Sequence, residues 1–129
     1  MGSDARRAAQ RRGLRAERLA ALWLQLKGYR ILGRQLRLGA GEIDLVARRG
    51  RTLAIVEVKQ RPTLAAAAEA IRPQQRQRIA RAAAAYLIRH PAGRSSAVRF
   101  DALLMAPWRL PRHIEAAWEY PPEKHPPWK

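Results

Sequence analysis

The sequence contains no cysteine among its 129 residues, which excludes disulfide bonds and thiolate chemistry. It also lacks any run of about 18 apolar residues, so we expect no segment to span a membrane. Residues 1–20 contain no apolar core of the kind that signal peptides carry, and we expect no secretion signal. These absences are typical of a cytoplasmic protein.

Acidic side chains are also scarce. Ten Asp and Glu stand against 26 Lys and Arg, and the formal net charge is +16 at pH 7. Such an excess predicts a polyanionic partner, either a nucleic acid or an anionic membrane surface. Arginine dominates over lysine, and its planar guanidinium suits phosphate groups. The alternative is a generally arginine-rich composition with no specific partner.

The length suits one domain, and the apolar periodicity predicts a mixed α/β fold in the order α-β-β-β-α-β. We expect a basic arm over residues 1–12, a folded domain over 13–120 and a proline-rich tail over 121–129. The first helix is predicted over 14–27, and three strands over 29–38, 42–48 and 52–59. A helical turn within 64–71, a helix over 73–89 and a strand over 98–105 follow. A short strand over 112–114 and a helical piece over 116–120 complete the domain.

The first predicted helix contains an acid in an apolar row. One row is wholly apolar and consists of Leu19, Leu22, Trp23 and Leu26. Glu17 belongs to a second row, at helical spacing from Leu14 and Leu24. Either Glu17 serves a functional site, or it is an exposed side chain that pairs locally with Arg15 or Arg18.

Two predicted strands carry charges where a buried strand is normally apolar. Glu42 and Asp44 lie in the strand over 42–48, whose opposite face is expected to hold Ile43, Leu45 and Ala47. Glu57 and Lys59 share one face at the end of the next strand. A hairpin turn at 49–51 makes these strands antiparallel neighbours, so Asp44 can meet Glu57. Since burying an ionised carboxylate is costly without a compensating cation, the acids need a common partner.

A divalent metal ion and a phosphodiester would satisfy that need. Asp44 and Glu57 are oxygen ligands suited to Mg²⁺, with Mn²⁺ as the alternative ion, and the Val58 carbonyl would add a neutral ligand. Glu17 would complete the metal shell or hold a metal-bound water. Lys59 would orient the attacking water or steady the phosphate. The alternative is that Glu57 and Lys59 form a solvent-facing ion pair on an edge strand.

Five segments resemble the YraN-like family of small bacterial proteins. They are GLRAE at 13–17, GYRIL at 28–32, GEIDLV at 41–46, VEVK at 56–59 and VRFD at 98–101, and the resemblance spans residues 13–118. It implies the restriction-endonuclease-like fold of the PD-(D/E)XK superfamily, similar in plan to archaeal Holliday-junction resolvases. By this resemblance Asp44 is the motif aspartate, Glu57 and Lys59 are the (D/E)XK pair, and Glu17 is the helix-borne acid.

The chain departs from the family pattern near the expected DNA contacts. Gln75 stands where relatives tend to carry a lysine, and Arg76 and Arg78 would replace that charge. Together with Arg15 these are the residues expected to bind DNA. Gln60 follows Lys59 where a small residue is more usual. If the comparison with junction resolvases holds, two active sites imply a homodimer.

Several other polar residues are predicted to be structural. Glu42 is either a ligand or a partner of a nearby arginine or of the glycine turn, and the second role is favoured. Asp101 is expected to pair with an arginine. The histidines lack metal-ligand spacing and are read as non-catalytic: His90, His113 and His125. The late tryptophans are expected to cap the core or pack the tail: Trp108, Trp118 and Trp128.

The first functional hypothesis is therefore a metal-dependent endonuclease acting on DNA, including branched or damaged DNA. The second is a nucleic-acid-binding protein that keeps the nuclease fold without the activity. The third is a basic protein of the membrane surface or the ribosome, in which the acids form salt bridges alone.

Overall fold

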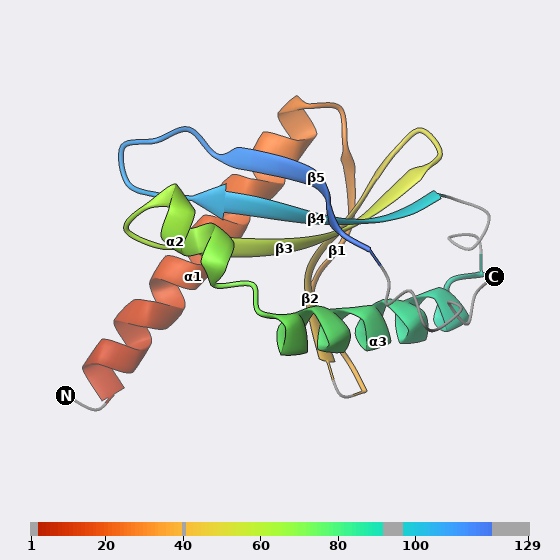
Figure 1. The fold of residues 1–129 in the computed structure, drawn as a ribbon, viewed down its shortest axis with the longest axis horizontal. Coiled ribbons are helices and arrows are strands. Elements are labelled where there is room, and N and C mark those ends of the chain that lie inside the picture. Colours follow the sequence, from red (N-terminus) through yellow and green to blue (C-terminus); the bar gives the residue numbers. More distant parts are fainter. Residues whose placement is uncertain (1–2, 40, 92–96, 120–129) are drawn as a thin grey trace.

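The computed structural model describes residues 3–39, 41–91 and 97–119. They form three helices and five strands in a mixed α/β fold, as predicted (Figure 1). The elements in chain order are α1 (Ser3–Leu26), β1 (Arg30–Leu38), β2 (Gly41–Arg49), β3 (Thr52–Gln60), α2 (Leu64–Glu69), α3 (Pro73–Arg89), β4 (Ala97–Met105) and β5 (Arg112–Trp118). None of these helices is long and apolar enough to cross a bilayer.

Residues 1–12 were expected to form a basic arm or the start of the first helix, and the structure shows the second. Helix α1 begins at Ser3, which suits the alanine, arginine and glutamine content of this stretch. The other end of the domain differs from the sequence prediction. The helical piece predicted over 116–120 is wrong, because β5 continues to Trp118. Pairing with β4 prevails there, and Ala116 takes a φ of 50° at an irregularity in that pairing. The predicted tail over 121–129, with His125 and Trp128, lies outside the described residues.

The five strands form one sheet in the order β1-β2-β3-β4-β5. Strands β1, β2 and β3 pair antiparallel, β3 and β4 pair parallel, and β5 pairs antiparallel with β4. Strand β3 is central and is buried on both faces from Leu53 to Val56. The parallel connection from β3 to β4 contains α2 and α3.

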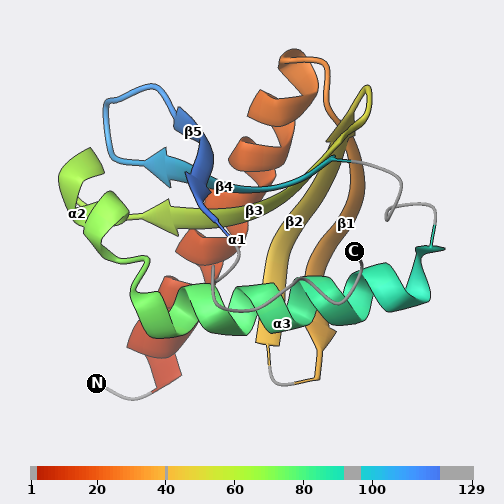
Figure 2. The same ribbon diagram turned by 45° about the vertical axis from the view of Figure 1, so that its right-hand side comes forward.

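Helices α1 and α3 pack on opposite faces of the sheet (Figures 1 and 2). The face under α1 buries Leu24 and three alanines of the helix against Leu45 and Val56. The face under α3 buries Ile79 and Leu87 against the other side of the same strands. The sheet is therefore the middle layer of three, and its strand ends lie between the two helices.

Most of the predicted apolar row of α1 faces away from the sheet. Leu19 and Leu22 are each 52% exposed and Leu26 is 74% exposed, whereas Trp23 packs partly buried against the sheet. The buried positions of the helix are Ala16, Ala20, Ala21 and Leu24. The three alanines let the helix axis come close to the sheet. As a consequence Glu17, beside the buried row, is half-buried on the sheet side.

Strand β2 also breaks the predicted alternation. Ile43 packs with Val46 under α3, whereas Leu45 and Ala47 pack under α1. The change occurs where the β2–β3 ladder ends, because β2 pairs with β3 only from Leu45 to Arg49. Strand β2 stays paired with β1 back to Gly41. The sheet therefore opens between β2 and β3 at Asp44.

Candidate active site

Asp44 lies at this opening. Its side chain accepts a hydrogen bond that a backbone carbonyl of β2 would accept in a continued ladder. Its Oδ2 accepts a hydrogen bond of 2.8 Å from the backbone N–H of Val58. In a continued ladder a backbone oxygen of β2 would be the expected partner of an N–H in β3. The carboxylate of Asp44 is thereby fixed against β3, one residue from Glu57.

Asp44 and Glu57 are close neighbours. Each carboxyl group lies near enough to shift the pKa of the other, and Glu57 is only 4% exposed. Burial, and then the neighbouring Asp44 charge, raise the pKa of Glu57 to about 8. Burial also raises the pKa of Asp44, although the Val58 bond opposes this. This raised pKa favours the protonated form of Glu57 at neutral pH when no metal ion is bound.

Two further donors orient Glu57. The Nζ of Lys59 lies 3.3 Å from Oε1 of Glu57, and Nε2 of Gln75 donates to the same oxygen at 3.0 Å. Lys59 comes from β3 and Gln75 from α3, so the carboxyl is held from two elements. The predicted common face of Glu57 and Lys59 is confirmed. The edge-strand alternative is wrong, because β3 is the central strand.

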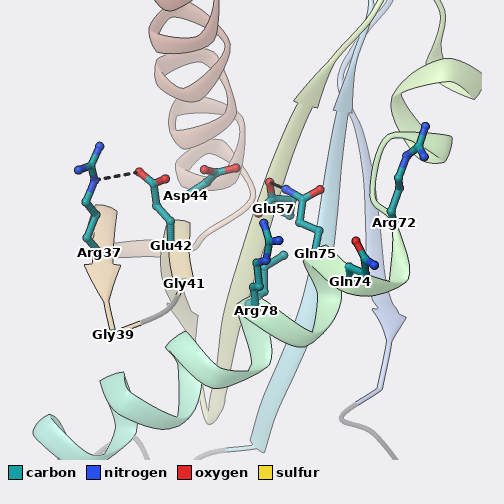
Figure 3. Close-up of a pocket in the computed structure, with 11 residues that line it drawn as sticks. Arg37, Gly39, Gly41, Glu42, Asp44, Glu57, Arg72, Gln74, Gln75 and Arg78 are labelled. Carbon is teal, nitrogen blue, oxygen red and sulfur yellow. Dashed lines mark hydrogen bonds and ion pairs between the residues drawn. The ribbon is translucent and has the colours of Figure 1, made fainter.

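Two cavities meet at the acid pair. The smaller, of about 550 Å³, lies between the start of β2 and the first turn of α3 (Figure 3). The larger, of about 840 Å³, lies between α1, β1 and the end of β3. Both are lined by Arg37, Glu42, Asp44, Glu57 and Gln75. The two cavities together form one open groove. The acid pair lies at the middle of this groove, between the part beside α3 and the part beside α1.

Glu17 lines the larger cavity together with the pair. Its partial burial raises its pKa, a hydrogen bond with Gln35 opposes this, and the Asp44 charge raises it further. Among residues 3–39, 41–91 and 97–119, no group of three or more His, Cys, Asp or Glu could hold a metal ion. The structure therefore brings two of the three predicted acids together and leaves Glu17 across the cavity.

Gln35 was not predicted to belong to the site. Its φ of 48° is unusual for a residue other than glycine, and its side chain reaches Glu17. Strand periodicity gave no sign of it, since Gln35 follows Arg34 in an ordinary strand pattern. The positive φ depends on how β1 bends beside β2.

Glu42 lies at the shared rim of both cavities and pairs with Arg37. The distance from Nε of Arg37 to Oε1 of Glu42 is 3.9 Å, and both side chains are largely exposed (Figure 3). This is the arginine partner that the favoured interpretation required.

The residues predicted to contact DNA are dispersed. Arg78 lines the smaller cavity, while Arg15 and Arg76 line neither. The Arg76 guanidinium lies 5.8 Å from the centre of the Trp118 ring. Gln75 holds Glu57 and borders both cavities. Other arginines that line the groove were not singled out from the sequence: Arg12, Arg37, Arg61 and Arg72.

Asp101 forms a separate structural network, as predicted. It is fully buried and accepts hydrogen bonds from Arg99, from Nε2 of His113 and from the N–H of Ala116. Burial would raise the pKa of Asp101, but the bonds from His113 and Arg99 outweigh it and lower the pKa. Asp101 lines neither cavity, so this network ties β5 to β4 away from the acid pair.

The predictions for the remaining aromatic residues are confirmed in part. Trp118 is buried and stacks on Phe100, with ring centres 5.8 Å apart. Trp108 is fully exposed and caps nothing in the described structure. His90 ends α3 and stacks on Tyr86, consistent with a non-catalytic role.

Comparison with known proteins places the chain in a family. The model of the family described as "Uncharacterised protein family UPF0102" matches residues 16–105. The chain belongs to UPF0102. The YraN-like resemblance predicted from the sequence is thereby confirmed.

Similar UPF0102 proteins occur in several bacteria. That of Paramagnetospirillum magneticum is 62% identical over 120 residues, covering 90% of this chain and 93% of the relative. That of Parvibaculum lavamentivorans is 57% identical over 111 residues, covering 86% and 84%. That of Caulobacter vibrioides strain NA1000 is 55% identical over 112 residues, covering 86% and 89%. The UPF0102 match includes Glu17, Asp44, Glu57 and Lys59, but these names specify no reaction, so function must be argued from the site.

Proposed function

We propose that this UPF0102 protein is a metal-dependent endonuclease that hydrolyses DNA phosphodiester bonds. The observation that carries the proposal is the meeting of Asp44 and Glu57 where β2 and β3 separate, with Lys59 against Glu57. A hairpin bearing the acids, followed by a helix and a parallel strand, is also the order expected of the PD-(D/E)XK superfamily. The net charge of +16 favours a polyanionic substrate.

The residues fit a hard divalent cation. A buried carboxyl group beside a half-buried one can share a metal ion, which would relieve their mutual repulsion. Asp44 and Glu57 would hold Mg²⁺ or Mn²⁺, with the Val58 carbonyl as the neutral ligand. When bound, such an ion neutralises phosphate charge and lowers the pKa of a coordinated water.

The side chains around the pair have distinct roles in this proposal. Val58 N–H and Gln75 fix the two carboxyl groups, so the ligand geometry is formed before substrate arrives. Lys59 supplies a positive charge at the pair and would stabilise the negative charge that develops on the phosphate. Glu17, across the larger cavity, would hold a water on the side opposite Gln75.

A DNA substrate has consequences for the location and the oligomeric state of the protein. A DNA substrate implies action in the cytoplasm. Cleavage of both strands of a branched DNA would require two copies of the site, hence a homodimer. The test therefore includes several branched forms.

The test is a cleavage assay on linear duplex, single-stranded, flapped and four-way DNA, with and without Mg²⁺ or Mn²⁺. Asp44→Ala and Glu57→Ala should each abolish metal-dependent cleavage while DNA binding persists. Glu69→Ala is the matched control, because Glu69 is exposed on α2 and lines neither cavity. Cleavage that survives in both acid variants would refute the site.

Calorimetric titration of the protein with Mn²⁺ separates the second hypothesis from the first. Wild type should bind the ion, and Asp44→Ala should not. DNA binding with neither metal binding nor cleavage would identify a nucleic-acid-binding protein with a nuclease-like fold.

A further inference from the structure

The groove carries unpaired positive charge on both sides of the acid pair. Arg72 and Arg78 line the smaller cavity, on the α3 side. Arg12 and Arg61 line the larger cavity, on the α1 side. Within the described residues no ion pair or hydrogen bond joins the side chain of Arg12, Arg72 or Arg78 to another residue. Arg61 donates to the carbonyl of its neighbour Gln60 and is otherwise exposed.

This arrangement matters because other arginines near the groove are already engaged. Arg37, at the shared rim, pairs with Glu42, and Arg99 is bound in the Asp101 network. The unpaired guanidinium groups therefore form two sets, one in each cavity, with the acids between them. Guanidinium groups without a carboxylate partner are suited to phosphate, which they can bind through two hydrogen bonds.

The sizes of the two cavities indicate what kind of ligand could lie between the two sets of arginines. About 550 and 840 Å³ fall in the range of small-ligand pockets, roughly 300–1,000 Å³. Each cavity has room for a short stretch of one strand. Both open at the acid pair, so a strand entering along α3 can leave along α1.

The smaller cavity has a rigid wall. A Cβ built on Gly41 would lie 2.3 Å from the carbonyl oxygen of Arg78, so β2 and α3 touch backbone to backbone. This contact fixes the base of the Arg78 side chain relative to the strand that carries Asp44. Arg78 is therefore positioned by β2, the strand that carries Asp44 (Figure 3).

We propose that one DNA strand passes through both cavities, so that the two arginine sets bind phosphates on opposite sides of the cleaved bond. Arg72 and Arg78 bind the strand on one side, and Arg12 and Arg61 bind it on the other. The inference rests on the proposed nuclease function and adds a path for the substrate strand. The α3 side of the groove binds phosphates on one side of the cleaved bond, and the α1 side binds phosphates on the other.

The chain offers matched controls for both sets. Arg81 is exposed on α3 one turn beyond Arg78 and lines neither cavity, and Arg11 precedes Arg12 on α1 and lines neither. Arg78→Ala and Arg12→Ala should each slow cleavage of a long single-stranded oligonucleotide by about tenfold, the effect of one charge-assisted hydrogen bond. Arg81→Ala and Arg11→Ala should leave the rate near that of wild type.

The decisive experiment shortens the substrate from one end at a time around the mapped cleavage position. The rate penalty of Arg78→Ala should disappear when nucleotides on one side are removed. The penalty of Arg12→Ala should disappear only when nucleotides on the other side are removed. If both penalties depend on the same side, or if they do not exceed those of the controls, the strand path is wrong.

A binding measurement keeps the inference testable apart from cleavage. A labelled single-stranded oligonucleotide is titrated with each variant in Ca²⁺ over a range of salt concentrations. Arg78→Ala and Arg12→Ala should each reduce the slope of log Kd against log salt by about 0.7, the value for one phosphate contact on a single strand. Equal slopes for all four variants would overturn the path. Binding losses as expected without any cleavage by wild type would overturn the nuclease function alone.

Discussion

The carboxylate of Asp44 accepts the backbone N–H of Val58 at 2.8 Å, at the residue where β2 stops pairing with β3. One side chain thus ends a strand ladder and becomes half of an acid pair. The separation of the strands opens the groove beside the pair, while the Val58 bond keeps Asp44 next to Glu57. The candidate site is therefore a local interruption of the sheet, and its properties lead to four predictions.

The metal-free protein should lose stability as pH rises from about 5 to 8. Burial and the Asp44 charge raise the pKa of Glu57 to about 8, so the folded state binds a proton that the unfolded state releases near its ordinary pKa of 4.5. That contribution is fully present below the unfolded pKa and is lost as pH passes the folded value. Glu57→Gln should remove this pH dependence, on the order of a few kcal/mol, while Glu69→Gln retains it.

Urea unfolding at several pH values measures this effect, and added Mg²⁺ should restore stability at pH 8 because the ion replaces the proton. A wild-type curve that stays flat between pH 5 and 8 without metal would show that the two carboxyl groups are not coupled.

Gln75→Ala should reduce the cleavage rate more than substrate binding. Removing the amide takes one of two donors from Oε1 of Glu57 and loosens the acid pair. We expect kcat to fall about tenfold with a smaller change in KM, and stability to fall by about 1 kcal/mol. Gln77→Ala, on the exposed side of α3, is the control. A change in KM alone would instead assign Gln75 to DNA binding, the role predicted from the sequence.

Gly41→Ala should destabilise the protein, whereas Gly13→Ala should stabilise it. A Cβ at position 41 would meet the Arg78 carbonyl oxygen at 2.3 Å, and a backbone atom cannot move away cheaply. We expect a loss of about 1–3 kcal/mol. A Cβ at position 13 meets nothing within 4 Å on an exposed part of α1, and alanine gains about 0.5–1 kcal/mol there. Thermal unfolding of the two variants should shift in opposite directions.

Asp101→Ala should destabilise the protein without altering the chemistry of the groove. The substitution leaves the Arg99 guanidinium and the His113 ring without their buried partner, which costs about 3–5 kcal/mol. Denaturant titration should show that loss. Cleavage measured under conditions where the variant is still folded should remain within a few-fold of wild type. Selective loss of cleavage with unchanged stability would mean that Asp101 belongs to the site after all.

Much of the fold was accessible from the sequence because its signals are local. The run Leu53–Val56 is apolar at every position, which identifies a strand buried on both faces. Pro73 marks the start of α3 because proline suits the first turn of a helix. The secondary structure was predicted wrongly where pairing with another strand overrides the local preference of the chain. Residues 116–118 form a strand because β4 offers a pairing edge, which no local pattern reveals.

By itself the sequence determined that Asp44, Glu57 and Lys59 lie at the ends of neighbouring apolar strands, because strand spacing and a hairpin turn require only adjacent residues. Tertiary structure alone decided that Gln75 holds Glu57, that Glu17 stands across the cavity with Gln35, and that alanines of α1 face the sheet. These outcomes depend on how closely helices approach strands and on where one strand leaves its neighbour. Such distances between elements are properties of packing, which periodicity along the chain does not contain.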